Sequence, residues 1–315
     1  MADLARVWKA LPPAVRYPLL VNGSGADRLL RIAHTLADAV NADSSDPDIL
    51  KNVLCDTVTH AWELDPFAQN AAGLVLQLHA QMPFLTPSAA AFCAACKALR
   101  TDFLDQGKAV GAMLEAGDTD SAKAVLERMA EKEPGNLFWF RFAAHLGFFW
   151  NELDWFEPWL ATPTLPPAIA ARFRADYFFA RSAWDKARTL YASAFAETGL
   201  TECLVRAGEC AKRAGQRETA AELWHEALAR RPWQVNLVHR LHDLEQNRDL
   251  PGNVPPGNGE VFLYSWNNAR ELDKTLASLA ASETGNAAFT ALDNGSRDGT
   301  GEVVAAWADR LGDRF

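Results

Sequence analysis

The sequence predicts a mainly α-helical protein, in which a solenoid of helix pairs is followed by a short, incomplete α/β segment. Two observations predict this architecture. A pattern of small and large apolar residues recurs at a spacing of about 33 residues in the middle of the chain. Near the end, short apolar runs alternate with leucines at helical spacing. A segment rich in proline and glycine lies between these parts, so we expect two domains.

The composition is that of an ordinary globular protein, and it excludes several functions. Hydrophobic residues make up 49% of the chain, charged residues 23%, and the formal net charge is −9. This acidic balance argues against nucleic acid as a partner. The first residues lack the apolar core of a signal peptide, and no stretch is long and apolar enough to span a membrane. Five cysteines are an odd number, so we expect a cytoplasmic protein with reduced thiols.

Residues 1–25 are expected to form an irregular lead-in. Three prolines and an Asn-Gly-Ser-Gly turn interrupt this segment, and one short helix is predicted near residues 4–11. Residues 26–248 are expected to be helical almost throughout. Alanine, leucine and glutamate are abundant there, and the breaks fall at clusters of glycine, proline and aspartate.

The clearest repeat unit spans residues 201–234. Two predicted helices would cross closely at the small residues Gly208 and Ala220, while Trp224 would fill the space beside the crossing. Residues 168–200 repeat the pattern, and a partial unit starts near Phe103. The units resemble tetratricopeptide repeats. The resemblance implies a solenoid of about five or six helix pairs, whose groove would bind a protein or glycan acceptor or another partner.

Residues 249–259 contain three prolines and three glycines, cannot continue a helix, and are predicted to be a linker. Residues 260–315 then begin with a predicted β-α-β unit. Its strands are the apolar runs 261–266 and 287–292, which we expect to pair in parallel because a helical crossover joins them. In such sheets, ligands bind beyond the carboxyl ends of the strands.

The octapeptide at residues 293–300 is the most specific motif of the chain. Together with Ser-Trp-Asn at the end of the first strand, it resembles the start of a family 2 glycosyltransferase, an A-type, Rossmann-like fold that uses nucleotide-diphosphate sugars. The resemblance implies that the complete protein is a glycosyltransferase that uses a divalent metal, Mg²⁺ or Mn²⁺. It also implies the residues that would bind the nucleotide sugar: Ser265, Trp266, Asn267, Asp293, Asn294 and Ser296.

Several of these side chains have an ordinary structural interpretation as well. Asp293 could contact the nucleotide base, or it could stabilise a solvated turn. Trp266 could stack on the base, or it could fill the core. Asp298 and Thr300 precede a predicted helix, and we expect them to cap its free N–H groups rather than to act in catalysis.

The resembled fold also needs an Asp-x-Asp metal site and a carboxylate base, and neither can be placed in residues 260–315. We expect the catalytic residues beyond Phe315, in a longer enzyme of which this chain holds the nucleotide-recognising start. The alternative is a naturally short, non-catalytic interaction scaffold, with a repeat groove that binds a protein and a vestigial transferase tail. The spacing of Cys93 and Cys96 suits a metal or redox site, but we expect both in an alanine-rich helix.

Overall fold

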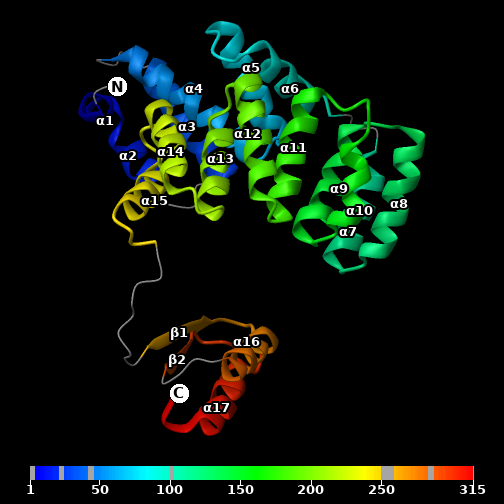
Figure 1. Ribbon diagram of the computed structural model, residues 1–315, viewed down its shortest axis with the longest axis vertical. Helices are drawn as coiled ribbons and strands as arrows, with labels where there is room; N and C mark the ends of the chain where they lie inside the picture. The colour runs from blue at the N-terminus through cyan, green and yellow to red at the C-terminus, as the bar shows by residue number, and fades with distance from the viewer. Residues whose placement is uncertain are drawn as a thin grey trace. The chain divides into compact units, whose positions relative to one another are not determined.

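A computed structural model (Figure 1) describes residues 4–20, 25–41, 46–99, 103–249, 259–282 and 287–314. The chain divides into two compact units, Met1–Asp249 and Leu250–Phe315. Most of the predicted linker, residues 250–258, lies outside the described residues. Asp249 belongs to the helical unit, where Arg217 (2.9 Å) and Lys212 (3.1 Å) form ion pairs with its carboxylate.

The first unit contains fifteen α-helices in its described residues, and short loops join most of them into antiparallel neighbours (Figure 1). They are α1 (Leu4–Ala10), α2 (Pro13–Leu20), α3 (Ala26–Asn41), α4 (Pro47–Leu64), α5 (Gln69–Gln81), α6 (Pro87–Lys97), α7 (Leu104–Glu115), α8 (Thr119–Lys132), α9 (Leu137–Phe149), α10 (Leu153–Leu160), α11 (Pro167–Ala180), α12 (Trp184–Thr198), α13 (Thr201–Arg213), α14 (Arg217–Arg230) and α15 (Val235–Glu245).

The N-terminal segment holds two helices, where the sequence predicts one helix in an irregular lead-in. Pro13 opens α2 because its fixed φ suits the first helical position, where no N–H is needed. Val7 of α1 and Val15 and Leu19 of α2 lie in the main core, and Leu11, between the two helices, is buried there as well. Arg16 links the helices by donating from Nε to the carbonyl oxygen of Leu11 (2.9 Å). The prolines therefore do not prevent this segment from forming two helices that pack on the core.

The pair α13 and α14 has the close crossing that the repeat pattern predicts. A Cβ added at Gly208 would lie 2.3 Å from Nε1 of Trp224, so only glycine leaves room for the indole. The Trp224 side chain is fully buried, and its Nε1 donates to the carbonyl oxygen of Val205 (3.1 Å). Gly215, with φ of 78°, supplies the left-handed turn between the two helices. Stacked pairs of this kind make the unit a tetratricopeptide-like solenoid.

Helix α4 packs against the later repeats through a buried ionic cluster. Arg231, at the end of α14, is fully buried and donates to Glu63 Oε2 (2.9 Å) and Asp56 Oδ1 (3.0 Å), both on α4. Arg172 on α11 donates to the carbonyl oxygen of Glu63 (2.9 Å). This hydrogen bond and the Arg231–Glu63 ion pair both join residues more than 100 positions apart in sequence.

Helix α6 also contacts the later repeats, through α11 and α12. Thr86, which caps α6, donates from its hydroxyl to the carbonyl oxygen of Thr198 at the end of α12 (3.0 Å). Helix α13 contacts α4 and is buried along most of its length. The chain's own α4 and α6 therefore cover the faces of α11 and α13 that would otherwise line a groove of the solenoid.

The second unit contains β1 (Glu260–Ser265), α16 (Ala269–Ala281), β2 (Ala288–Asp293), α17 (Thr300–Leu311) and a short 3₁₀ helix (Gly312–Arg314). The two strands pair in parallel, as predicted, in a register that sets Ser265 opposite Asp293. Trp307 of α17 packs with leucines of α16 in a small core on one face of the sheet. The other face exposes Phe262 and Tyr264. Two strands do not by themselves establish the Rossmann-like fold that the resemblance implies.

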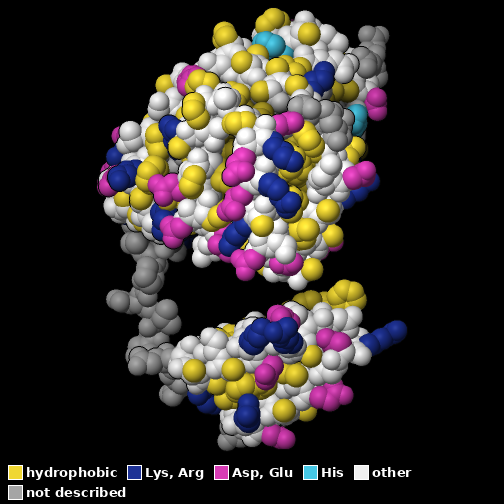
Figure 2. Space-filling model, turned by 90° about the vertical axis from the view of Figure 1, so that its right-hand side faces the viewer, with side chains coloured by type: hydrophobic (Ala, Val, Ile, Leu, Met, Phe, Trp, Pro, Cys, Tyr) yellow, Lys and Arg dark blue, Asp and Glu magenta, His cyan; other side chains and the backbone are white. Residues whose placement is uncertain are grey.

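None of the described helices is long and apolar enough to cross a membrane. Figure 2 shows acidic, basic and apolar side chains interspersed on one face of the helical unit. Among the described residues on that face, basic side chains are scattered rather than gathered into the continuous surface that suits nucleic acid.

Candidate functional sites

The loops that follow β1 and β2 lie side by side at the carboxyl ends of the strands. The backbone N–H of Asn294 donates to the carbonyl oxygen of Ser265 (3.0 Å), which extends the strand pairing by one bond. Asn267 N donates to Ser296 Oγ (2.8 Å), and Arg297 N donates to Asn267 Oδ1 (2.8 Å). The parallel register thus brings together the two groups of residues that the sequence singles out for nucleotide-sugar binding.

The carboxylate of Asp293 accepts hydrogen bonds from the backbone N–H (3.1 Å) and the hydroxyl of Ser296. These bonds close the turn that begins at Asn294. Asp293 therefore has the geometry of a turn-stabilising aspartate, and a contact with a nucleotide base stays a prediction.

Ser265 and Trp266 have contrasting environments at the end of β1. The Ser265 side chain is buried, and among the described residues its hydroxyl has no hydrogen-bond partner. Trp266 is 61% exposed, so the interpretation that it fills the core is wrong. An exposed indole beside the strand ends is free to stack on a planar ligand.

Asp298 ties together the starts of the two helices of this unit. Its Oδ2 accepts from the N–H of Ala269 at the start of α16 (3.0 Å), and its Oδ1 accepts from the N–H (3.2 Å) and hydroxyl (2.6 Å) of Thr300 at the start of α17. The hydrogen bond from the Thr300 hydroxyl lowers the pKa of the Asp298 carboxyl, with help from the two backbone N–H groups. Asp298 therefore caps the first N–H group of α17, as the sequence predicts, and that of α16 as well. Thr300 is the first residue of α17, and its Oγ1 accepts from the N–H of Asn268 (3.2 Å) rather than from an N–H of α17, so the prediction that Thr300 caps this helix is wrong.

A metal site is not evident in the part of the chain that the structure describes, where no three His, Cys, Asp or Glu side chains converge. The expected Mg²⁺ or Mn²⁺ thus has no ligand set among these residues. Cys93 and Cys96 lie in the main core on α6, and burial raises the pKa of both thiols; that of Cys93 rises to about 12. Thiols in this environment are packing residues, which agrees with the interpretation from sequence.

A groove lies between α7 and α9 in the helical unit. Its volume is about 460 Å³. The two helices approach closely beside it, because a Cβ on Gly107 would meet the Phe138 ring at 2.6 Å. The lining residues are Gly111, Leu114, Glu115, Arg141, Phe142, His145, Phe149 and Trp150.

Aromatic side chains dominate the α9 wall of this groove. Phe149 is 73% exposed, the largest exposure of any large apolar side chain among the described residues. Its ring stacks on His145, with centroids 5.0 Å apart and planes 10° apart. Arg141 lies over the Phe142 ring, with its guanidinium carbon 4.8 Å from the centroid, and burial lowers its pKa. The wall therefore combines a large apolar surface with one cation and a ring that can form hydrogen bonds.

This groove has only a weak signal in the sequence. Residues 137–160 are rich in aromatic side chains, and such side chains are also typical of the packing between helices. The spacing of three residues on α9 is the signal that indicates the groove wall. Arg141, His145 and Phe149 follow one another at intervals of four residues, which places them on one face of α9.

No protein-family model matches the chain, and no curated protein matches it. Among solved structures it is similar to the crystal structure of yeast Tom70, with 12% sequence identity and a TM-score of 0.27. The match covers 72% of this chain and 61% of that chain, so this chain spans less than two thirds of the length of the structure it matches. A similarity of this size carries no argument about function. The solenoid assignment rests on the helix pairs themselves, and the transferase resemblance rests on its sequence motif.

Proposed function

We propose that the helical unit is a protein-interaction module, and that it binds its partner in the α7–α9 groove. The observation that carries this proposal is the exposure of Phe149 in the wall of this groove. Burial of a phenylalanine stabilises by about 1.5–3 kcal/mol, so an exposed aromatic wall in a groove marks a binding surface. The faces of α11 and α13 that contact α4 and α6 are not available to bind a partner in this way.

The groove has room for one or two large side chains of a partner segment. An apolar side chain would cover Phe149 and Trp150, while Arg141 would meet a carboxylate or carbonyl group of the same segment. Grooves of this kind usually accept an amphipathic helix or an extended peptide through a few anchor residues. We therefore expect a partner with an apolar anchor next to an acidic residue.

Selection from a random peptide library on the immobilised full chain tests this proposal. The affinity of a selected peptide would then be measured by fluorescence polarisation for the wild type and for Phe149→Ala. We expect a loss of about ten-fold or more, since aromatic anchors at interfaces contribute about 2 kcal/mol or more. Val238→Ala, which shortens another exposed apolar side chain (42% exposed) on α15, is the matched control. Equal affinities for the wild type and Phe149→Ala would refute the assignment.

A second candidate function is the one that the sequence motif implies, nucleotide-sugar recognition by the second unit as part of a glycosyltransferase. It is supported by the joined strand-end loops, by the exposed Trp266 ring, and by the Ser265 hydroxyl, which lacks a hydrogen-bond partner in the part of the chain that the structure describes. Calorimetric titration of the full chain with nucleoside diphosphates, with and without Mn²⁺, tests it. The proposal expects weaker binding by Asp293→Ala than by the wild type. Failure of every nucleotide to bind, or equal binding by the variant, would count against it.

A further inference from the structure

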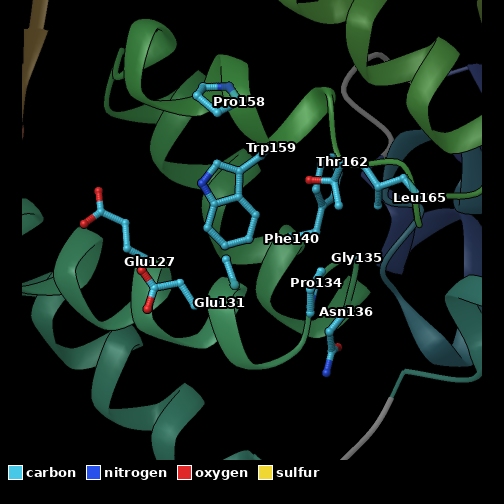
Figure 3. Close-up of a pocket in the computed structure, with 11 residues that line it drawn as sticks. Glu127, Glu131, Pro134, Gly135, Asn136, Phe140, Pro158, Trp159, Thr162 and Leu165 are labelled. Atoms are coloured by element: carbon cyan, nitrogen blue, oxygen red, sulfur yellow. The ribbon is translucent and has the colours of Figure 1, made fainter.

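A second cavity of the helical unit, of about 270 Å³, lies on the other side of α9 from the interaction groove. Phe140, in the wall of this cavity, and Phe149, in the α7–α9 groove, are nine positions apart in sequence. Nine positions are about two and a half helical turns, so the two side chains lie on opposite sides of α9. Helix α8, the α8–α9 loop, α10 and the loop after α10 form the rest of the wall. Figure 3 shows the Trp159 ring between the two glutamates of α8 and the side chains of Thr162 and Leu165.

The floor and one wall of this cavity are apolar and well supported. Phe140 is almost completely buried and Leu165 is buried as well. Trp159 projects from α10, with its ring centroid 5.7 Å from that of Trp155. Trp155 is itself fixed, since its Nε1 donates to Glu127 Oε1 (2.6 Å). Contact with Trp155 therefore sets the position of the Trp159 ring, which lines the cavity.

The rim of the cavity carries two carboxylates without a balancing charge. Glu127 and Glu131 are four residues apart on α8, so their side chains lie on the same face of the helix, where like charges repel. Among the described residues, neither carboxylate has a basic side chain within ion-pair distance, whereas many other acidic side chains of this unit do. A cation in the cavity would relieve this repulsion.

We propose that this cavity binds the side chain of a lysine that belongs to a partner protein. The methylene stem would lie along Phe140 and Leu165, and the ammonium group would meet Glu127 and Glu131 beside the Trp159 ring. An ammonium group has three donors that can reach two separate carboxylates, while the planar fork of a guanidinium matches a single carboxylate. An indole attracts a cation over its face. Anionic ligands are excluded by the two carboxylates.

The probe for this site is N-acetyl-lysine-N-methylamide, titrated into the full chain and followed by NMR through the indole N–H resonances. The uncharged analogue with norleucine in place of lysine has the same stem without the ammonium group. We expect the lysine derivative to bind and the norleucine derivative to bind at least ten-fold more weakly. A comparison with free lysine tells whether the site prefers a lysine within a protein chain or the free amino acid. Tighter binding of free lysine than of the derivative would overturn the assignment to a protein partner.

The variant Glu131→Gln keeps the size of the side chain and removes one charge. We expect it to bind the lysine derivative about three- to ten-fold more weakly at low salt, since a partly exposed ion pair contributes modestly. Glu157→Gln, an exposed position on α10 outside the cavity, is the matched control. Phe149→Ala should leave lysine binding unchanged, which separates this site from the interaction groove. Equal binding of both derivatives, unchanged binding by Glu131→Gln, or no binding of the lysine derivative would overturn the proposal.

Discussion

Replacement of Arg231 by leucine tests how the helical unit is held together. The Arg231 side chain is 1% exposed, and it forms ion pairs with Glu63, which is 0% exposed, and with Asp56, which is 19% exposed. The leucine variant would leave Glu63 buried without a cation. The loss of one partner from a buried ion pair costs about 3–5 kcal/mol. Because Glu63 lies on α4 and Arg231 follows α14, the loss would weaken the contact between the N-terminal helices and the later repeats.

The free energy of unfolding can be measured by urea denaturation of the full chain, followed by far-ultraviolet circular dichroism. With a urea dependence of about 2–3 kcal/mol per molar, a loss of about 4 kcal/mol lowers the midpoint by about 1.5 M. Arg128→Leu removes an exposed arginine of α8 and is the matched control, for which we expect a change within about 0.5 kcal/mol.

The double variant Arg231→Met with Glu63→Met separates the loss of the ion pair from the loss of packing. Glu63 Oε1 and Arg231 Nη1 have no hydrogen-bond partner among the described residues, so the cluster is incompletely satisfied. We therefore expect the double variant to be more stable than Arg231→Leu, since apolar pairs often replace buried ion pairs without loss. Equal stability of Arg231→Leu and Arg128→Leu would refute a role of this cluster in holding α4 on the repeats.

Two further predictions concern single side chains. Gly208→Ala should lower the free energy of unfolding by about 1–3 kcal/mol, because its new methyl group would overlap the Trp224 indole. Gly111 has open space around it, so Gly111→Ala should leave the melting temperature unchanged or raise it. Equal melting temperatures would contradict the close crossing. The pKa of the Asp298 carboxyl should lie below the ordinary aspartate value, because the Thr300 hydroxyl and backbone N–H groups donate to it. The stability that Asp298 adds is therefore present above the ordinary carboxyl pKa and is lost as the pH falls through its lowered folded pKa. NMR titration checks this, and Thr300→Val, which removes the main donor, should raise the midpoint.

The elements of the second unit were predictable because each one has a strong local signal. Residues 261–266 and 287–292 are short apolar runs bounded by turn-forming residues, and the leucines between them recur at helical spacing. The observed strands and helices begin within a few residues of the predicted positions. The position of the predicted site residues at the strand ends follows from the parallel pairing alone. Which ligand they bind does not follow, since Asp293 and Ser296 satisfy each other in this structure.

The helix pairs of the first unit were also predictable, down to Gly208 and Trp224. The lead-in was not, because proline content is a weak guide where a proline can open a helix. The α7–α9 groove was hidden as well, since aromatic residues suit both a core and an exposed surface. The exposure of Phe149 depends on which neighbours reach it, and that is decided by the whole unit.

The sequence alone therefore determined the helix pairs, the division into two units and the parallel β-α-β arrangement. Each of these depends on residues close together in the chain, so periodicity and turn residues are sufficient to predict them. Only the tertiary structure decided that α4 and α6 cover α11 and α13 while the groove between α7 and α9 stays accessible. That outcome depends on ion pairs such as Arg231 with Glu63, whose partners lie 168 positions apart. No local sequence pattern predicts such a pairing, because arginine and glutamate side chains also occur on solvent-exposed helix faces.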